Sequence, residues 1–151
     1  METDREAFTS FVAEVEPRLH RALVALRGRE IGREATAEAL AWAWANWSAV
    51  EKMANPAGYL YRVGSSRTRP RREGIWLTTA PADLPGFEPG LGPALSRLSD
   101  RQRTAVVLVH GCGWTHQEVA DALGVSRSSV GTHVDRAMAQ LRKELGVDDD
   151  D

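Results

Sequence analysis

The segment from Trp114 to Leu145 most strongly constrains the fold of this chain. Thr115 and Glu118 have the spacing of a capping box, in which each side chain bonds the backbone amide of the other residue. Trp114 and Val119 hold the two positions of a hydrophobic staple around the same helix start. The sequence therefore predicts a helix that begins directly after Thr115.

Gly124 is expected to close this helix, because glycine readily adopts the left-handed conformation found at helix ends. Ser126 is then expected to cap a second helix. Apolar residues recur three or four positions apart along it, as they do on one face of a helix: Val130, Val134, Met138, Leu141 and Leu145. Two helices joined by a short glycine turn are typical of the helix-turn-helix unit, whose second helix enters the DNA major groove.

The outer face of this second helix carries short or basic hydrogen-bonding groups: Arg127, Ser128, Ser129, Thr132, His133 and Arg136. No carboxylate precedes Asp135 in the helix. Arginine can read guanine with two hydrogen bonds, and serine or threonine can reach bases or phosphates. The alternative is an amphipathic hairpin with a solvated polar face, which would need neither the short turn nor the acid-poor start.

The N-terminal part repeats apolar residues at helical spacing: Phe8, Phe11, Val12, Val15, Leu19, Leu23 and Leu26. We expect Pro17 to start or bend that helix, because proline removes a backbone donor. An alanine-rich helix is expected over residues 34–50, after a break around Gly28 to Gly32. A third helix should begin at Asn55-Pro56 and end near Pro70.

The composition changes after residue 70, where proline and glycine alternate without a period and indicate a linker. In the block that follows, Ser99 and Gln102 have capping-box spacing, and a buried helix should end at Gly111. The expected fold class is all-α, with two small helical domains joined by a Pro/Gly-rich linker. The expected segments are a helical domain over 1–70, a linker over 71–93, a helix-turn-helix domain over 94–147 and an acidic tail over 148–151.

Composition argues against several classes of protein. The net charge is -2, so the chain as a whole is not strongly basic. No apolar run approaches the roughly 20 residues of a membrane span, and the first residues do not resemble a signal peptide. We therefore expect a cytoplasmic protein. The single cysteine, Cys112, has only His110 and His116 as neighbouring ligands, too few for structural zinc, and we expect no metal or cofactor. No Ser/His/Asp set or Gly-rich phosphate loop stands out, so an enzyme is not expected.

Two further groups of residues are compatible with nucleic acid. Five arginines fall within eleven residues that contain no acid: Arg62, Arg67, Arg69, Arg71 and Arg72. Such a cluster favours a phosphate-binding track over a merely solvated surface. Trp42, Trp44 and Trp47 are either core residues, the interpretation we favour, or platforms on which unpaired bases stack.

Four stretches resemble one known family. They are Leu98-Ser99-Asp100-Arg101-Gln102-Arg103, residues 114–142, Glu38-Ala39-Leu40-Ala41-Trp42-Ala43-Trp44, and Asn55-Pro56-Ala57-Gly58-Tyr59-Leu60-Tyr61-Arg62-Val63. They are similar to sigma-70 family sigma factors of the extracytoplasmic-function type, which keep only regions 2 and 4. The first two stretches resemble region 4 and the last two resemble region 2.

The resemblance implies a division of labour between the two regions. Region 4 would contact the minus-35 element in the major groove, with Thr115 near phosphate and these groove residues: Arg127, Ser128, Ser129, Thr132, His133 and Arg136. Region 2 would dock on core RNA polymerase through Glu34 and Glu38, while Arg62, Arg67 and Arg69 hold the opening minus-10 DNA. The implied partners are promoter DNA, core polymerase and an anti-sigma factor.

The sequence departs from the family pattern at Ala37, where glutamine is usual, and at Gly131 and His133, where basic residues are common. Residues 68–70, Thr-Arg-Pro, shorten the last helix of region 2. Two alternatives to a sigma factor stay open. One is a stand-alone helix-turn-helix regulator acting without polymerase, and the other is a polymerase- or anti-sigma-binding protein without promoter activity.

Overall fold

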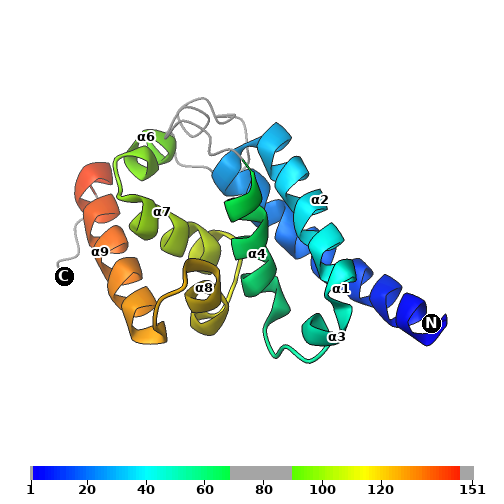
Figure 1. The fold of residues 1–151 in the computed structure, drawn as a ribbon. Coiled ribbons are helices and arrows are strands. Elements are labelled where there is room, and N and C mark those ends of the chain that lie inside the picture. The colour runs from blue at the N-terminus through cyan, green and yellow to red at the C-terminus, as the bar shows by residue number, and fades with distance from the viewer. Residues whose placement is uncertain (1, 69–89, 147–151) are drawn as a thin grey trace.

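The computed structural model describes residues 2–68 and 90–146, and every regular element within these two ranges is a helix (Figure 1). The N-terminal block contains α1 (Glu2–Arg27), α2 (Arg29–Ala45), α3 (Trp47–Val50) and α4 (Pro56–Arg67). The C-terminal block contains α6 (Leu91–Ser96), α7 (Asp100–Val106), the π-helix η1 (Val107–Gly111), α8 (His116–Leu123) and α9 (Arg127–Leu145). The all-α expectation is confirmed. Most of the expected linker, and the acidic tail at 148–151, lie outside the described residues.

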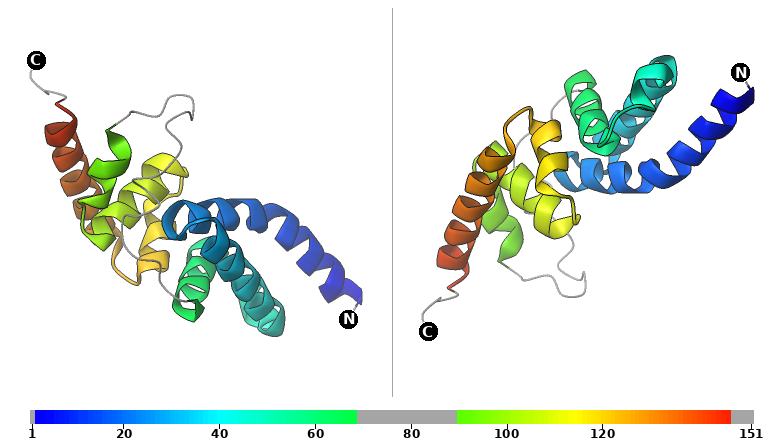
Figure 2. Two further views of the ribbon diagram at one scale, coloured as in Figure 1. Left: turned by 90° about the horizontal axis from the view of Figure 1, so that it is seen from above. Right: turned by 90° about the horizontal axis from the view of Figure 1, so that it is seen from below.

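Long helix α1 does not begin or end at its proline. Pro17 lies in the interior of the helix, which curves along its length in Figure 2. A proline inside a helix removes one ladder hydrogen bond and commonly produces such a bend. Gly28 alone separates α1 from α2, which begins at Arg29, five residues earlier than expected, with Gly32 inside the helix. The expected helix also does not run unbroken to Val50, because α2 ends at Ala45 and α3 follows.

The helices of the N-terminal block pack around a shared apolar core. Helix α2 runs along α1, and α4 lies across both. Leu19, Leu23, Ala35, Ala39 and Leu60 are fully buried between them. Small residues on α2 and α4 let these helices approach closely, which explains why the alanine-rich stretch forms a buried seam.

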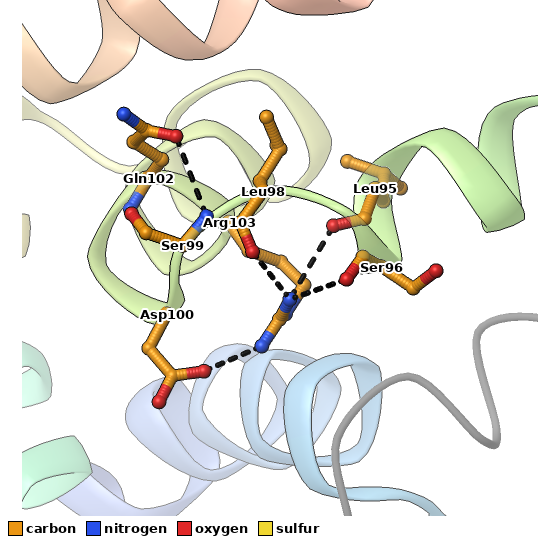
Figure 3. Close-up of polar contacts among 7 residues, drawn as sticks. All are labelled: Leu95, Ser96, Leu98, Ser99, Asp100, Gln102 and Arg103. Carbon is orange, nitrogen blue, oxygen red and sulfur yellow. Dashed lines mark hydrogen bonds and ion pairs between the residues drawn. The ribbon is translucent and has the colours of Figure 1, made fainter.

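Helix α9 forms one wall of the C-terminal block and contacts α6, α7 and α8. Arg103 of α7, itself buried, joins α6 to α7 (Figure 3). Its guanidinium donates to the carbonyl of Leu98 at 3.0 Å and, at 3.4 Å, to those of Leu95 and Ser96, and it pairs with Asp100. These bonds give an additional donor to carbonyls in the last turn of α6 and just beyond it; the Leu95 carbonyl also accepts from the Leu98 amide at 3.2 Å.

The two blocks pack against each other through α4 and α8, which lie side by side in Figure 1. The approach is close because α4 has a glycine there: a Cβ on Gly58 would collide with the backbone carbonyl of Glu118 and lie 3.0 Å from Cβ of Asp121. Beside this contact, the rings of Tyr61 and Trp114 meet edge to face with centroids 6.0 Å apart. One continuous core therefore includes residues of both blocks.

An ion pair extends this contact to α1. The Arg18 guanidinium donates to both oxygens of the Glu118 carboxylate at 2.9 Å and lies 5.4 Å from the ring centroid of Trp114. The Glu118 carboxylate is nearly buried, whereas the Arg18 side chain keeps 41% of its exposure. Arg18 thus connects the first helix of the chain to the start of α8.

Candidate nucleic-acid interface

Helices α8 and α9 form the expected helix-turn-helix. The amide of Glu118 donates to Oγ1 of Thr115 at 3.1 Å, and the Glu118 carboxylate accepts from the Thr115 amide at 3.0 Å, so the capping box is complete. Trp114 and Val119 are buried, as a hydrophobic staple requires. Gly124 closes α8 in the left-handed conformation at φ 70°. The local signals in the sequence therefore placed this unit correctly.

The N-terminus of α9 is well suited to receive an anion. Ser126 caps the helix by accepting from the Ser129 amide at 3.1 Å, and the first turn contains no acidic residue. Arg127 and Ser128 are exposed beside this cap. A helix N-terminus carries a partial positive charge and free amide donors, so phosphate or electronegative base edges are favoured there.

The remaining candidates on α9 lie farther along the same helix. Thr132 and Arg136 are exposed and, with Ser128, are spaced four residues apart, so they form one row along the outer face. The Thr132 hydroxyl donates to the Ser128 carbonyl at 3.3 Å, which fixes its position in the row. Ser129 and His133 are half-buried at the edge of this row. Arg136 and three hydroxyl groups lie along this face, and Arg127 lies at the start of the helix, so together they can bond base edges and phosphates.

Thr115 lies at the other end of the helix-turn-helix, at the start of α8. Its side chain is exposed, although its oxygen already accepts from the Glu118 amide. His116 and Gln117 are exposed in the first turn of α8, next to Thr115. Neither residue could be predicted as a DNA-facing residue from the sequence, because neither forms a pattern with its neighbours.

Helix α4 carries the candidates for a second DNA contact. Arg62 and Arg67 are exposed, and Arg69 lies outside the described residues. The Arg62 guanidinium lies 5.3 Å from the ring centroid of Tyr59 and reaches the Gly124 turn of the C-terminal block. The helix ends at Arg67, so the expected early termination near residues 68–70 is confirmed.

Helix α2 carries the candidate docking residues. Glu34 and Glu38 are exposed and lie one turn apart, on one face of the helix. The three tryptophans that follow differ in their surroundings. Trp47 is buried against Phe8 and Phe11, Trp42 is half-buried against Tyr59, and Trp44 keeps 48% of its exposure. The core interpretation therefore holds for Trp47, whereas Trp44 presents much of its ring at the surface.

Within the described ranges, no cluster of histidine, cysteine and carboxylate side chains could hold a metal ion. Cys112 is half-buried between the blocks, and burial raises the pKa of its thiol, which makes the thiolate scarcer at neutral pH. None of the helices that the structure describes has the length and apolar content that a bilayer crossing requires.

The ion pair between Arg18 and Glu118 could not be seen in the sequence. The two residues lie 100 positions apart, and each has a complete explanation within its own helix: Arg18 as a surface residue and Glu118 as a capping residue. Gly58 is equally well explained as an ordinary small residue near a helix start. Contacts between distant segments leave no periodic signal, so only the fold shows them.

The comparisons with known proteins agree with this geometry. Residues 94–143 match the family model for sigma-70, region 4. Among solved structures, the chain is similar to the sigma factor RpoE from Bartonella quintana, determined in complex with the anti-sigma factor NepR. The TM-score is 0.70 at 21% sequence identity, covering 95% of this chain and 99% of that chain. No curated protein sequence matches the chain. Residues 94–143 are therefore similar to sigma-70 region 4, and the chain has, over nearly its whole length, the fold of the sigma factor RpoE.

Proposed function

We propose that the chain binds core RNA polymerase and directs promoter-specific initiation of transcription, with α9 reading the minus-35 element. The observation that carries this proposal is the acid-free, exposed N-terminal face of α9, on a helix-turn-helix inside the region 4 match. A helix that enters the major groove presents its N-terminal residues to base edges. The mechanism is recognition, and core polymerase supplies the chemistry.

On α9, Arg127 is the candidate for direct base readout because it is exposed at the first position of the helix. Arginine there can form two hydrogen bonds to guanine, a contact that discriminates against the wrong base by about 1–3 kcal/mol. Ser128, Ser129, Thr132 and His133 complete the groove contacts. Arg136 and Thr115, at the two ends of the unit, are assigned to backbone phosphates, which set register rather than sequence.

The N-terminal block is assigned the other two roles. Glu34 and Glu38 on α2 form the docking face for core polymerase. Arg62 and Arg67 on α4, with Arg69 beyond it, hold the minus-10 DNA as it opens. We also propose that an anti-sigma factor binds and restrains the chain, since the similar sigma factor RpoE forms a complex with the anti-sigma factor NepR, and that the chain acts in the cytoplasm.

Run-off transcription with purified bacterial core polymerase on a library of promoter fragments tests the proposal. The wild-type chain should yield specific transcripts, and Arg127→Ala should abolish or redirect them. Arg101→Ala is the matched control, because Arg101 is an exposed arginine of the same block that lies on α7 and not on the recognition helix α9. Its transcripts should match those of the wild type.

The same experiment separates the two alternatives. Binding of fragments by the chain alone, with no transcript in the presence of core polymerase, would indicate a stand-alone regulator. Binding of core polymerase without binding of DNA would indicate a protein that occupies polymerase without promoter activity. Glu34→Lys combined with Glu38→Lys should remove binding to core polymerase while leaving fragment binding by α9 intact.

A further inference from the structure

We propose that the acidic tail, residues 148–151, folds back along one face of α9 and competes there with DNA phosphates. This face, the α9 stripe, consists of Arg136, Ala139, Gln140 and Lys143. The docking of the tail rests on the charges and geometry of this end of the chain. Its effect on DNA rests on the proposed function, because Arg136 is assigned there to backbone phosphate. The two parts can therefore be tested separately.

The α9 stripe continues the row of DNA-facing candidates on the same helix. Its members lie three or four positions apart, which keeps them on one side of an α-helix. Arg136 belongs both to the stripe and to the row formed with Ser128 and Thr132. Asp135 is turned away from Arg136 by about 100° around the helix axis. A shallow depression in the surface lies over the stripe, so an occupant of this depression would meet Arg136 directly.

The stripe carries positive charge that the described part of the chain does not neutralise. Among the residues that the structure describes, neither Arg136 nor Lys143 has an ion-pair partner. The carboxylate beside the stripe, that of Glu144, is already engaged: it accepts from Arg97 at 2.6 Å and from Nε2 of Gln140 at 3.0 Å. All residues of the acidic tail are aspartates. An exposed ion pair contributes little alone, but several opposite charges within reach can form a network.

The end of α9 makes this contact reachable. Gly146 ends the helix in the left-handed conformation at φ 72°, and its amide donates to the Lys143 carbonyl at 3.4 Å. A left-handed residue at this position ends the helical path, so the chain can leave the helix axis. At about 3.3 Å per residue, residues 147–151 can span about 16 Å. Arg136 lies about 15 Å before Gly146 along the axis, at about 1.5 Å per residue, so the tail can reach the whole stripe.

Competition follows because the tail and DNA would share Arg136. A chain whose tail is docked for at least half of the time should bind DNA at least about twofold more weakly than a chain whose tail is free. Charges at a surface are screened within about 10 Å at 0.1 M salt and within about 3 Å at 1 M. The restraint should therefore weaken as the salt concentration rises.

Amide NMR spectra of the full chain test the docking. The tail-neutral variant changes every aspartate of the tail: Asp148→Asn, Asp149→Asn, Asp150→Asn and Asp151→Asn. At low salt, its signals should differ from those of the wild type along the α9 stripe, including the side-chain amide of Gln140. The spectra should converge at about 1 M salt, where screening is strong. The matched control neutralises exposed acids of the N-terminal block and should leave the stripe signals in place: Asp4→Asn, Glu6→Gln, Glu14→Gln and Glu51→Gln.

Three outcomes would overturn the docking. The stripe signals could be the same in the wild type and the tail-neutral variant. The differences could instead centre on another basic surface, such as that around Arg127. They could also disappear when the wild-type chain is diluted at constant salt, which would mean that the tail of one chain binds the stripe of another.

Binding of the chain to promoter fragments at low salt tests the competition. The tail-neutral variant should bind at least about twofold more tightly than the wild type. Simple repulsion between the tail and DNA would also produce a gain, and Lys143→Gln distinguishes the two causes because Lys143 is not assigned to DNA. Neutralising the tail should give a smaller gain in the Lys143→Gln background, as a double-mutant cycle would show. Lys52→Gln is the matched control, because Lys52 is exposed just after α3, on the side of the molecule opposite α9 (Figure 1), and it should leave the gain unchanged.

Equal gains in all these backgrounds would show repulsion alone and overturn the competition. A tail that docks by NMR but gives no gain in affinity when neutralised would overturn it as well, while specific fragment binding and transcripts from the wild type uphold the proposed function. Absence of fragment binding and transcripts from every chain would overturn the proposed function and the competition with it, and the NMR spectra would still decide the docking.

Discussion

Glu118 shows how one carboxylate can serve a local and a distant contact together. One of its oxygens accepts from the Thr115 amide and from Arg18, and the other accepts from Arg18 alone. Burial acts most strongly on its pKa and raises it, but the hydrogen bonds from Arg18 and Thr115 together outweigh burial, so the pKa lies below the ordinary glutamate value. The charged form is therefore the one that the fold favours.

Loss of the cap at Thr115 should weaken the C-terminal block. Thr115→Ala removes the acceptor of the Glu118 amide, and we expect the free energy of unfolding to fall by about 1 kcal/mol. Urea denaturation, monitored by circular dichroism, measures this loss in the free energy of unfolding. Thr115→Ser keeps the hydroxyl and should stay within about 0.5 kcal/mol of the wild type. Equal losses in both variants would show that the cap is not the cause.

Arg103 should be among the most sensitive residues of the C-terminal block. Arg103→Met keeps the apolar stem but leaves three carbonyls without this donor and Asp100 without this partner. Stranded buried polar groups cost about 1–3 kcal/mol each, so we expect a loss of about 2–4 kcal/mol in the free energy of unfolding. Arg101→Met, at an exposed site on the same helix, should change it by less than about 0.5 kcal/mol. Equal free energies of unfolding for the two variants would show that the bonds of Arg103 do not stabilise the C-terminal block.

At the level of elements, the sequence predicted what local chemistry specifies. The starts of α4, α7, α8 and α9 each carry a proline, serine or threonine at the right offset, and the structure begins these helices there. The expected buried helix ending at Gly111 does end there, but it changes to a π-helix after Val106. This π-helix is only five residues long, which is too short to leave a period of its own in the apolar pattern.

The candidate site likewise has a part that local sequence patterns predict and a part that they do not. The face of α9 could be predicted because helical spacing determines which side chains share a face. The contacts of Arg18 with Glu118, and of Arg62 with Tyr59 and the Gly124 turn, depend on how whole helices pack. Such contacts follow from the three-dimensional arrangement and could not be predicted from spacing.

Two glycines inside helices should respond to alanine in opposite directions. A Cβ on Gly64 of α4 would lie 2.6 Å from the carbonyl oxygen of Ala35 in α2, so Gly64→Ala should cost about 1–3 kcal/mol of stability. A Cβ on Gly131 of α9 would meet nothing within 4 Å, so Gly131→Ala should add about 0.5–1 kcal/mol through helix propensity. Thermal or urea denaturation of the two variants provides the comparison. A shift of the same sign in both would contradict the close packing of α2 and α4.

For the whole molecule, the ion pair makes stability depend on pH in a defined direction. The pKa of Glu118 is lowered in the folded chain. The contribution of its carboxylate to the free energy of unfolding is therefore fully present above the unfolded glutamate pKa of about 4.3. It is lost as the pH falls through the lowered folded-state pKa. The difference in unfolding free energy between the wild type and Arg18→Gln should therefore be constant near neutral pH and shrink in acid.

Urea titrations of both chains at several pH values measure this difference, and the comparison cancels the effect of other carboxylates. Arg5→Gln, a substitution of the same kind at an exposed position of α1, should show no such dependence. A difference that stays constant from neutral pH into acid would mean that the ion pair adds nothing to stability.

The backbone contact at Gly58 also bears on how such a chain can diversify. On the α8 side, the atom that Gly58 approaches most closely is the main-chain carbonyl of residue 118, which every residue type possesses. The side chains that we propose to face DNA lie on another helix, α9. Under the proposed function, substitutions that change the preferred promoter can therefore accumulate on α9 without altering this main-chain contact between the two blocks.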